Sequence, residues 1–159
     1  PCPCGNFGST HRKCLCSSVQ IGRYFRKISG PLLDRIDLQI EVPQVRFRDL
    51  FALNRAESSA DILGRVLKAR ETQSLRFRLN FITTNACMTA SAIKRHCQLD
   101  ERSQALFEKS TTDLGFSARS YSRILKVART IADMEDSPNI KDGHLEEAIS
   151  YRLLDQFSL

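Results

Sequence analysis

The chain has 159 residues, of which 42% are hydrophobic and 26% charged, values that are ordinary for a globular protein of one or two small domains. No apolar run approaches the ~20 residues that a membrane helix needs, and the first residues lack the apolar stretch of a secretory signal. We therefore expect a cytoplasmic protein without a membrane partner.

The net charge of +6 is unevenly distributed along the chain. Residues 1–80 carry 14 Lys and Arg against 7 Asp and Glu, whereas residues 81–159 carry 10 against 11. The basic half is suited to the phosphates of a nucleotide or of a nucleic acid, and a merely solubilising surface is the alternative.

Four of the six cysteines lie close together near the start of the chain. They form the pattern Cys2-x-Cys4, nine further residues, then Cys14-x-Cys16. Clustered cysteines without a secretory signal favour a metal over disulfides. Four thiolates at this spacing can close a tetrahedral structural Zn²⁺ site, with His11 as a substitute ligand, and four reduced, solvent-facing thiols are the alternative.

The next residues predict a helix over 18–29 and a strand over 36–42. Gly30 and Pro31 end the helix, and the strand alternates between apolar and polar residues as a half-buried strand does. One strand is not stable alone, so residues 1–47 are expected to be the remnant of a larger α/β sheet. If the strand is ordered, we expect it to pair with another copy or to fold back onto the rest of the chain.

Arg35 lies at the start of that strand, with Asp34 and Asp37 on either side. A guanidinium group held in such a place matches phosphate oxygens in shape and charge. Judged from these residues alone, however, an ion pair with Asp34 or Asp37 on a solvated turn is the favoured interpretation.

Residues 48–57 are predicted to be a linker with one helical turn near Asp49–Leu53, and residues 58–159 to be a helical bundle with its own core. The predicted helices span about 58–78, 89–97, 100–114, 117–134 and 142–154. The apolar side of the first of these helices consists of Ile62, Leu63, Val66, Leu67 and Ala69.

Arg119 falls in the first turn of the helix that Ser117 caps. A cation there opposes the helix dipole, unless an anion binds between the guanidinium and the free backbone N–H groups. The alternative is a surface arginine paired with Asp113 or Glu147.

Five residues with reactive side chains receive no catalytic role. The histidines are expected to be surface or core residues, and the two isolated cysteines to be packed thiols; these residues are His11, His96, His144, Cys87 and Cys97.

The segment LLDRID at 32–37, the CPCG…CxC cluster and SARSYSRILKVARTIAD at 117–133 together resemble the magnesium-chelatase-like branch of the AAA+ ATPases, of the ComM/YifB type. The resemblance runs from Cys2 to Tyr151. It implies a mainly α fold: a helical-bundle AAA+ lid at 58–159, preceded by the last helix and strand of an α/β AAA+ core with a zinc knuckle. The motif G-x-x-x-x-G-K-[ST] and a Walker B strand end do not occur here, so the resemblance implies the C-terminal part of a larger ATPase.

The resemblance also implies roles for particular residues. Arg35 is the arginine finger acting in trans on the neighbouring subunit's nucleotide, and Arg119 is the sensor-2 arginine, with Arg123 as the fallback. ATP and Mg²⁺ in the intact protein, a homo-oligomeric ring and a DNA partner follow from the same likeness, and the 159 residues alone are expected to be inactive. Two alternatives remain: a zinc-containing nucleic-acid-binding module, and a helical interaction domain with an unstructured N-terminal tail.

Overall fold

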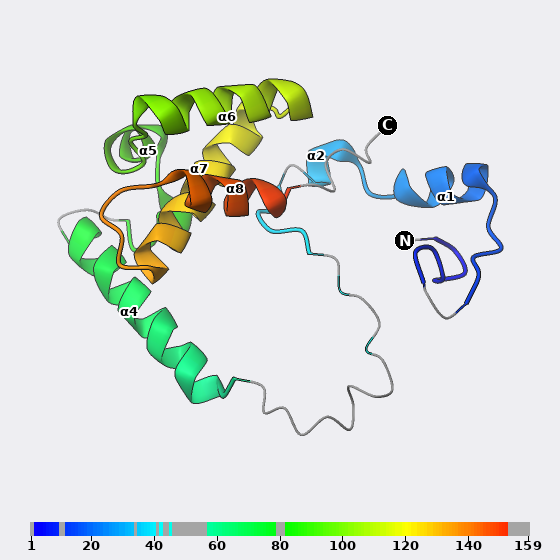
Figure 1. Ribbon diagram of the computed structural model, residues 1–159, viewed down its shortest axis with the longest axis horizontal. Coiled ribbons are helices and arrows are strands. Elements are labelled where there is room, and N and C mark those ends of the chain that lie inside the picture. Colours follow the sequence, from blue (N-terminus) through cyan, green and yellow to red (C-terminus); the bar gives the residue numbers. More distant parts are fainter. Residues whose placement is uncertain are drawn as a thin grey trace.

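The computed structural model describes residues 2–9, 12–33, 35–40, 42, 45, 57–78 and 82–152. The elements in these ranges are α1 (Ser18–Phe25), α2 (Gly30–Leu33), α4 (Ser59–Phe77), the 3₁₀ turn η1 (Asn85–Cys87), α5 (Ala90–His96), α6 (Glu101–Leu114), α7 (Ala118–Met134) and α8 (Asp142–Ser150), and none is a strand (Figure 1). The mainly helical fold class is thereby confirmed. None of the described helices combines the length and the apolar character needed to cross a membrane.

The helix starts follow from capping residues. The side chains of Ser58, Thr89, Asp100 and Ser117 each accept a hydrogen bond from the backbone N–H three residues ahead. At the end of α6, Gly115 takes a left-handed conformation with φ 64°, which a residue with a Cβ adopts only at a cost. Local chemistry therefore fixes the boundaries of α4 to α7 that the sequence predicts.

Helix α7 is the centre of the bundle. Helices α4, α5 and α8 and the turn η1 pack against it, and α6 packs against α8. The core forms where apolar side chains of these elements and of the connections between them meet: Phe77, Met88, Cys97, Phe107, Ile124, Leu125, Ala128, Ala132, Ile140, Leu145, Ala148 and Ile149. The predicted apolar stripe of α7 is thus largely confirmed. Tyr121, which is 38% exposed, lies at the edge of the core and stacks on Phe107.

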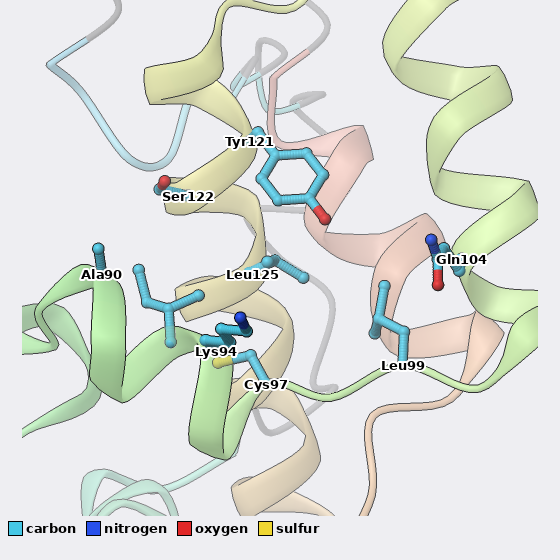
Figure 2. A pocket seen from close by; sticks show the side chains of 9 residues that line it. Ala90, Lys94, Cys97, Leu99, Gln104, Tyr121, Ser122 and Leu125 are labelled. Atoms are coloured by element: carbon cyan, nitrogen blue, oxygen red, sulfur yellow. The ribbon is translucent and has the colours of Figure 1, made fainter.

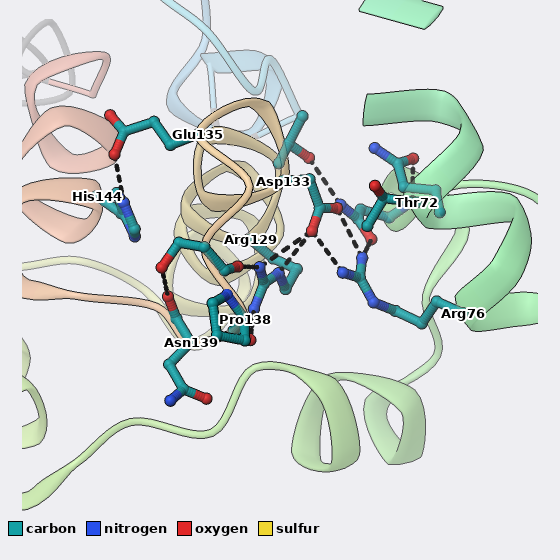
Figure 3. A network of polar contacts seen from close by, with 12 residues as sticks. Thr72, Arg76, Arg129, Asp133, Glu135, Pro138, Asn139 and His144 are labelled. Carbon is teal, nitrogen blue, oxygen red and sulfur yellow. Dashed lines mark hydrogen bonds and ion pairs between the residues drawn. The ribbon is translucent and has the colours of Figure 1, made fainter. Parts of the chain in front are cut away.

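A buried polar network joins α4, η1 and α7 (Figure 3). Asp133 accepts hydrogen bonds from Arg76 Nη1 at 2.6 Å, Asn85 Nδ2 at 2.8 Å and Arg129 Nε at 3.1 Å. Burial raises the pKa of Asp133, but the bonds from Arg76 and Asn85 outweigh it, so the pKa is lowered overall. The carboxylate is therefore ionised and holds two arginines from different helices.

The N-terminal part differs from the predicted helix and strand. Helix α1 ends at Phe25 instead of residue 29, and residues 30–33 form the helical turn α2. Pro31 does not prevent this turn, because proline is well suited to the first turn of a helix, where its missing N–H is not needed.

The strand predicted over 36–42 does not form in its described residues, and Asp34, Glu41 and Pro43 lie outside them. The backbone N–H of Gln39 instead donates to Tyr151 O at 2.9 Å, so the segment folds back onto the bundle. An alternating pattern makes a strand only when a neighbouring strand satisfies its backbone, and the described residues supply none.

The apolar side predicted for α4 is only partly buried. Ala69 and Phe77 belong to the buried side, whereas Ile62, Leu63 and Val66 are 42–54% exposed and Leu67 is 59% exposed. The first half of α4 extends away from the other helices in Figure 1, so nothing in the described chain covers it. Of the predicted apolar side, only Ala69 is buried in the described structure, and the other four residues remain exposed.

The predicted linker lies almost wholly outside the described residues, as does the helical turn near Asp49–Leu53. Of the helix predicted over 142–154, α8 confirms 142–150, residues 151–152 form a turn, and residues 153–154 lie outside the described residues.

Candidate functional site

The four N-terminal cysteines come together around a tight loop. The sulfur atoms of Cys2, Cys4, Cys14 and Cys16 all lie within 4.8 Å of one another. The Cys2–Cys4, Cys2–Cys14 and Cys4–Cys14 sulfurs are 3.4, 3.7 and 3.6 Å apart. The loop closes through a hydrogen bond from Gly5 N to Cys2 O at 3.0 Å, with Gly5 at φ 76°.

This geometry fits a tetrahedral zinc ion. With Zn–S bonds of about 2.3 Å, the sulfurs of a tetrahedral site are separated by about 3.8 Å, close to the distances found here. The backbone N–H of Phe7 donates to Cys2 Sγ at 3.3 Å, the kind of contact that orients a metal ligand and stabilises its charge. His11, the substitute ligand, lies outside the described residues.

The protonation of the cluster also fits a cation. A hydrogen bond from the backbone N–H of Asn6 and one from Cys2 lower the pKa of Cys4 to about 6. The backbone N–H of Cys16 lowers the pKa of Cys14, but desolvation and the bonds to Cys2 and Cys4 outweigh it and raise that pKa to about 12. Cys4 is thus the thiol most readily converted to a thiolate, which is the form that binds a metal.

Arg35 is exposed just after α2, where its Nη1 donates to Pro31 O at 3.0 Å. Of the two pairings considered from the sequence, Asp34 lies outside the described residues, and Asp37 forms its ion pair with Arg123 instead. The guanidinium of Arg35 is therefore oriented by a backbone carbonyl and remains accessible to a ligand.

Arg119 and Arg123 line one pocket of about 450 Å³ at the N-terminal half of α7. The remaining lining includes Asp37, Ala86, Ser122 and Lys126. Arg123 is paired with Asp37, whereas Arg119 is exposed and has no ion pair with any residue that the structure describes. The pairing of Arg119 with Asp113 or Glu147 is not observed.

Lys126 is a functional candidate that the sequence reasoning missed. It lies seven residues after Arg119 on the same face of α7, and its Nζ donates to Ala86 O at 2.8 Å. The spacing of 119, 123 and 126, one helical turn each, is the signal that identifies this row of cations.

A second pocket of about 480 Å³ lies between α5, α6 and α7 (Figure 2). Apolar side chains such as Ile93, Leu99 and Leu125 line much of it, with Lys94 and Ser122 among its polar residues. Ser122 also lines the cationic pocket, so an apolar hollow adjoins a cluster of positive charge.

The isolated cysteines and two of the histidines have structural surroundings. Cys97 is buried and burial raises its pKa to about 11, as expected of a packed thiol, but Cys87 is exposed, so that part of the prediction is wrong. His96 packs edge-on against Phe77 at 5.5 Å between ring centroids. His144 is buried, accepts from Lys141 N through Nδ1, and contacts Glu135 at 3.0 Å through Nε2.

Comparison with known proteins identifies the family. The model of the family described as "Magnesium chelatase, subunit ChlI C-terminal" matches residues 56–152, and that of "Magnesium chelatase, subunit ChlI" matches residues 1–50. The chain belongs to the magnesium chelatase ChlI family.

Curated relatives in this ChlI family are similar over nearly the whole chain. Competence protein ComM of Haemophilus influenzae is 41% identical over 155 residues, which are 97% of this chain and 29% of that protein. YifB of Escherichia coli is 38% identical over 157 residues, 98% of this chain and 30% of that protein. The chain thus spans about three tenths of the length of these ChlI-family relatives.

Proposed function

We propose that this chain is the C-terminal part of a ring-forming AAA+ ATPase of the magnesium-chelatase-like type. In this proposal its bundle is the lid over a bound nucleotide, and Arg119 contacts the nucleotide's phosphates in cis with Arg123 beside it. Arg35 reaches the nucleotide held by the neighbouring subunit. The phosphate loop and its lysine would come from a part of the protein that these residues do not include.

The observation that carries the proposal is the pocket on α7. Three cations, Arg119, Arg123 and Lys126, line it, and an apolar hollow adjoins it across Ser122. A nucleotide combines a flat, largely apolar base with a strongly anionic phosphate chain, so it matches this pairing of environments. Guanidinium groups suit the phosphate end because they stay charged and bind oxygens in pairs.

The chemistry would be phosphoryl transfer from ATP to water. Charge on the phosphate oxygens is neutralised by the arginines while water attacks the terminal phosphorus and the bond to the bridging oxygen breaks. Mg²⁺, bound to the phosphates in the intact protein, would neutralise part of the same charge. Arg35 is suited to act in trans because it lies exposed outside the bundle, 84 residues before Arg119 in the chain.

We further propose that the cysteine cluster holds a structural Zn²⁺ and that the intact protein acts on DNA. All four ligand positions would be filled by sulfur, which leaves no open position for catalysis. The basic charge of residues 1–80 supports a DNA partner through its phosphates. The same features favour a zinc-containing nucleic-acid module as a second candidate function.

Hydrolysis of ATP by the full-length protein tests the proposal. Arg35→Ala, which removes the proposed finger, is expected to reduce the rate of ATP hydrolysis about a thousandfold or more. Arg119→Ala, which removes the proposed sensor, is expected to reduce it substantially. Both variants should still assemble. Arg102→Ala is the matched control, because Arg102 is 87% exposed on α6 and pairs only with Asp142 among the described residues.

Mixing the two inactive variants separates action in trans from a simple loss of folding. In a randomly mixed ring, about a quarter of the interfaces combine an intact Arg119 with an intact Arg35 from the neighbour, so activity should return. Normal turnover of Arg35→Ala would refute the finger. Steep salt-dependent DNA binding without ATP hydrolysis would favour the nucleic-acid module.

A further inference from the structure

Asp37 lies in the cationic pocket of α7. Its carboxylate forms an ion pair with Arg123, and Arg119 and Lys126 line the same pocket. The carboxylate of this chain thus occupies a place suited to an external anion, one turn of helix away from the exposed Arg119.

The segment that carries Asp37 is held mainly by polar contacts. Arg152, which is 1% exposed, donates from Nη1 to Ile36 O and from Nη2 to Ser120 Oγ at 3.0 Å. Gln39 N donates to Tyr151 O at 2.9 Å. The apolar side chains nearby contribute little burial, since Ile36 and Leu38 are 40% and 49% exposed. Such a segment can move without the loss of a hydrophobic core.

We propose that Asp37 competes with external anions for the α7 pocket and so lowers the pocket's affinity for them, because an incoming phosphate must displace its carboxylate from Arg123. The inference rests on the proposed phosphate site. A carboxylate carries one negative charge, whereas the end of a polyphosphate carries more, so a polyphosphate exchanges for Asp37 favourably and a singly charged anion does not.

Displacement of Asp37 also has a consequence for Arg35, two residues before it. The Asp37–Arg123 ion pair ties that segment to α7, so its loss loosens the chain that bears the finger. Phosphate bound by one subunit would in this way change the freedom of the arginine that the same subunit offers to its neighbour.

The test measures binding of inorganic pyrophosphate and tripolyphosphate to the 159-residue chain. Asp37→Asn is expected to bind both about threefold more tightly than wild type, since an exposed ion pair is worth about 0.2–1 kcal/mol. Asp136→Asn is the matched control: it removes the same charge from the pair with Lys68 on α4, outside the pocket, and asparagine suits its φ of 54°. It should leave both affinities unchanged.

The gain in affinity of Asp37→Asn distinguishes an anion that displaces Asp37 from one that binds beside it and is repelled by its charge. Displacement predicts the same factor for both ligands, together with faster hydrogen exchange of the Gln39 amide when ligand binds to the wild type. A gain that grows with ligand charge, with unchanged exchange at Gln39, would mean that the anion binds beside Asp37 and would overturn the inference.

Arg119→Gln and Arg123→Gln separate this inference from the proposed function. If both leave tripolyphosphate binding unchanged, or if no variant binds it, the α7 pocket of this chain does not bind phosphate by itself and the role of Asp37 is refuted, whereas the proposed function is decided by ATP hydrolysis of the full-length protein. If they weaken binding while Asp37→Asn equals wild type, the phosphate site stands and only the role of Asp37 is refuted.

Discussion

Replacing Asp133 by asparagine should destabilise the bundle more than any conservative change at its surface. The carboxylate is 1% exposed and accepts hydrogen bonds from Arg76, Asn85 and Arg129. The side-chain amide that replaces the carboxylate in Asp133→Asn carries no charge, and its NH₂ group faces some of the hydrogen-bond donors that the carboxylate accepts from. Arg129, 3% exposed, would then be a buried cation without its counter-charge.

The magnitude follows from the cost of breaking a buried ion pair, about 3–5 kcal/mol when one partner loses its charge. With a urea dependence of about 2 kcal/mol/M for a domain of this size, the midpoint of unfolding should fall by roughly 1.5–2.5 M. Circular dichroism of the helices during urea titration measures this directly. Asp136→Asn is again the control, because its carboxylate is 50% exposed and an exposed ion pair with Lys68 is worth at most about 1 kcal/mol.

The same residue sets the response to acid. The pKa of Asp133 is lowered on folding, so its contribution to stability is fully present above the unfolded value of 3.8 and is lost as the pH falls through the lower folded value. Asp133→Asn should therefore unfold with a weaker dependence on pH below 3.8 than wild type. A loss of less than about 1 kcal/mol, with an unchanged acid response, would refute the view that this network holds α4 and η1 to α7.

Three further predictions concern separate parts of the chain. Cys4→Ser should abolish stoichiometric zinc, measured by atomic emission, while the helical signal of the bundle persists, since the thiols cluster with one another near the N-terminus; full zinc retention would exclude a four-sulfur site. Gly115→Ala should cost about 1 kcal/mol of unfolding free energy because of its φ of 64°, whereas Gly64→Ala, in an open position within α4, should gain roughly 0.5–1 kcal/mol; equal effects would contradict the conformational argument. Phe107→Ala should cost about 3–5 kcal/mol, but Ile62→Ala, at a site 44% exposed, much less; a similar loss for Ile62 would mean that the first half of α4 is covered in solution.

The sequence predicts those features of the fold that neighbouring residues determine. Ser58, Asp100 and Ser117 cap helices within three residues of themselves, and Gly115 ends one by its own conformation, so their positions are readable from a short window. The periodic stripe of α7 is equally local. These features place the bundle without reference to anything distant in the chain.

Features that depend on distant partners were not predictable. Arg76 and Asp133 are 57 residues apart, and nothing in either neighbourhood indicates that they meet. The apolar residues of α4 have the right spacing for a core, but burial requires an opposing element, which the described residues do not supply for Ile62 or Leu67. The alternation at 36–42 likewise describes a strand's faces and not whether a neighbouring strand exists.

The candidate site divides in the same way. The close approach of the four cysteines follows from their spacing and the glycines between them, and Arg119 follows from its place in the first turn of α7. The ion pair of Asp37 with Arg123 joins residues 86 positions apart. From the sequence, the only ion pair considered for Asp37 was therefore one with its neighbour Arg35.

Arg152 bears on how this protein can be divided and recombined. One side chain joins Ile36, within the stretch matched by one family model, to Ser120, within the stretch matched by the other. The two stretches are therefore not independent modules, and an excised bundle would lose an acceptor for a buried cation. Because that acceptor is a main-chain carbonyl, the contact does not depend on the side chain at position 36, although the Ile36 N–H that donates to Leu33 O disfavours proline there. The segment around Ile36 should therefore be replaceable by the corresponding segment of a relative, provided that its backbone still follows the same path past Arg152.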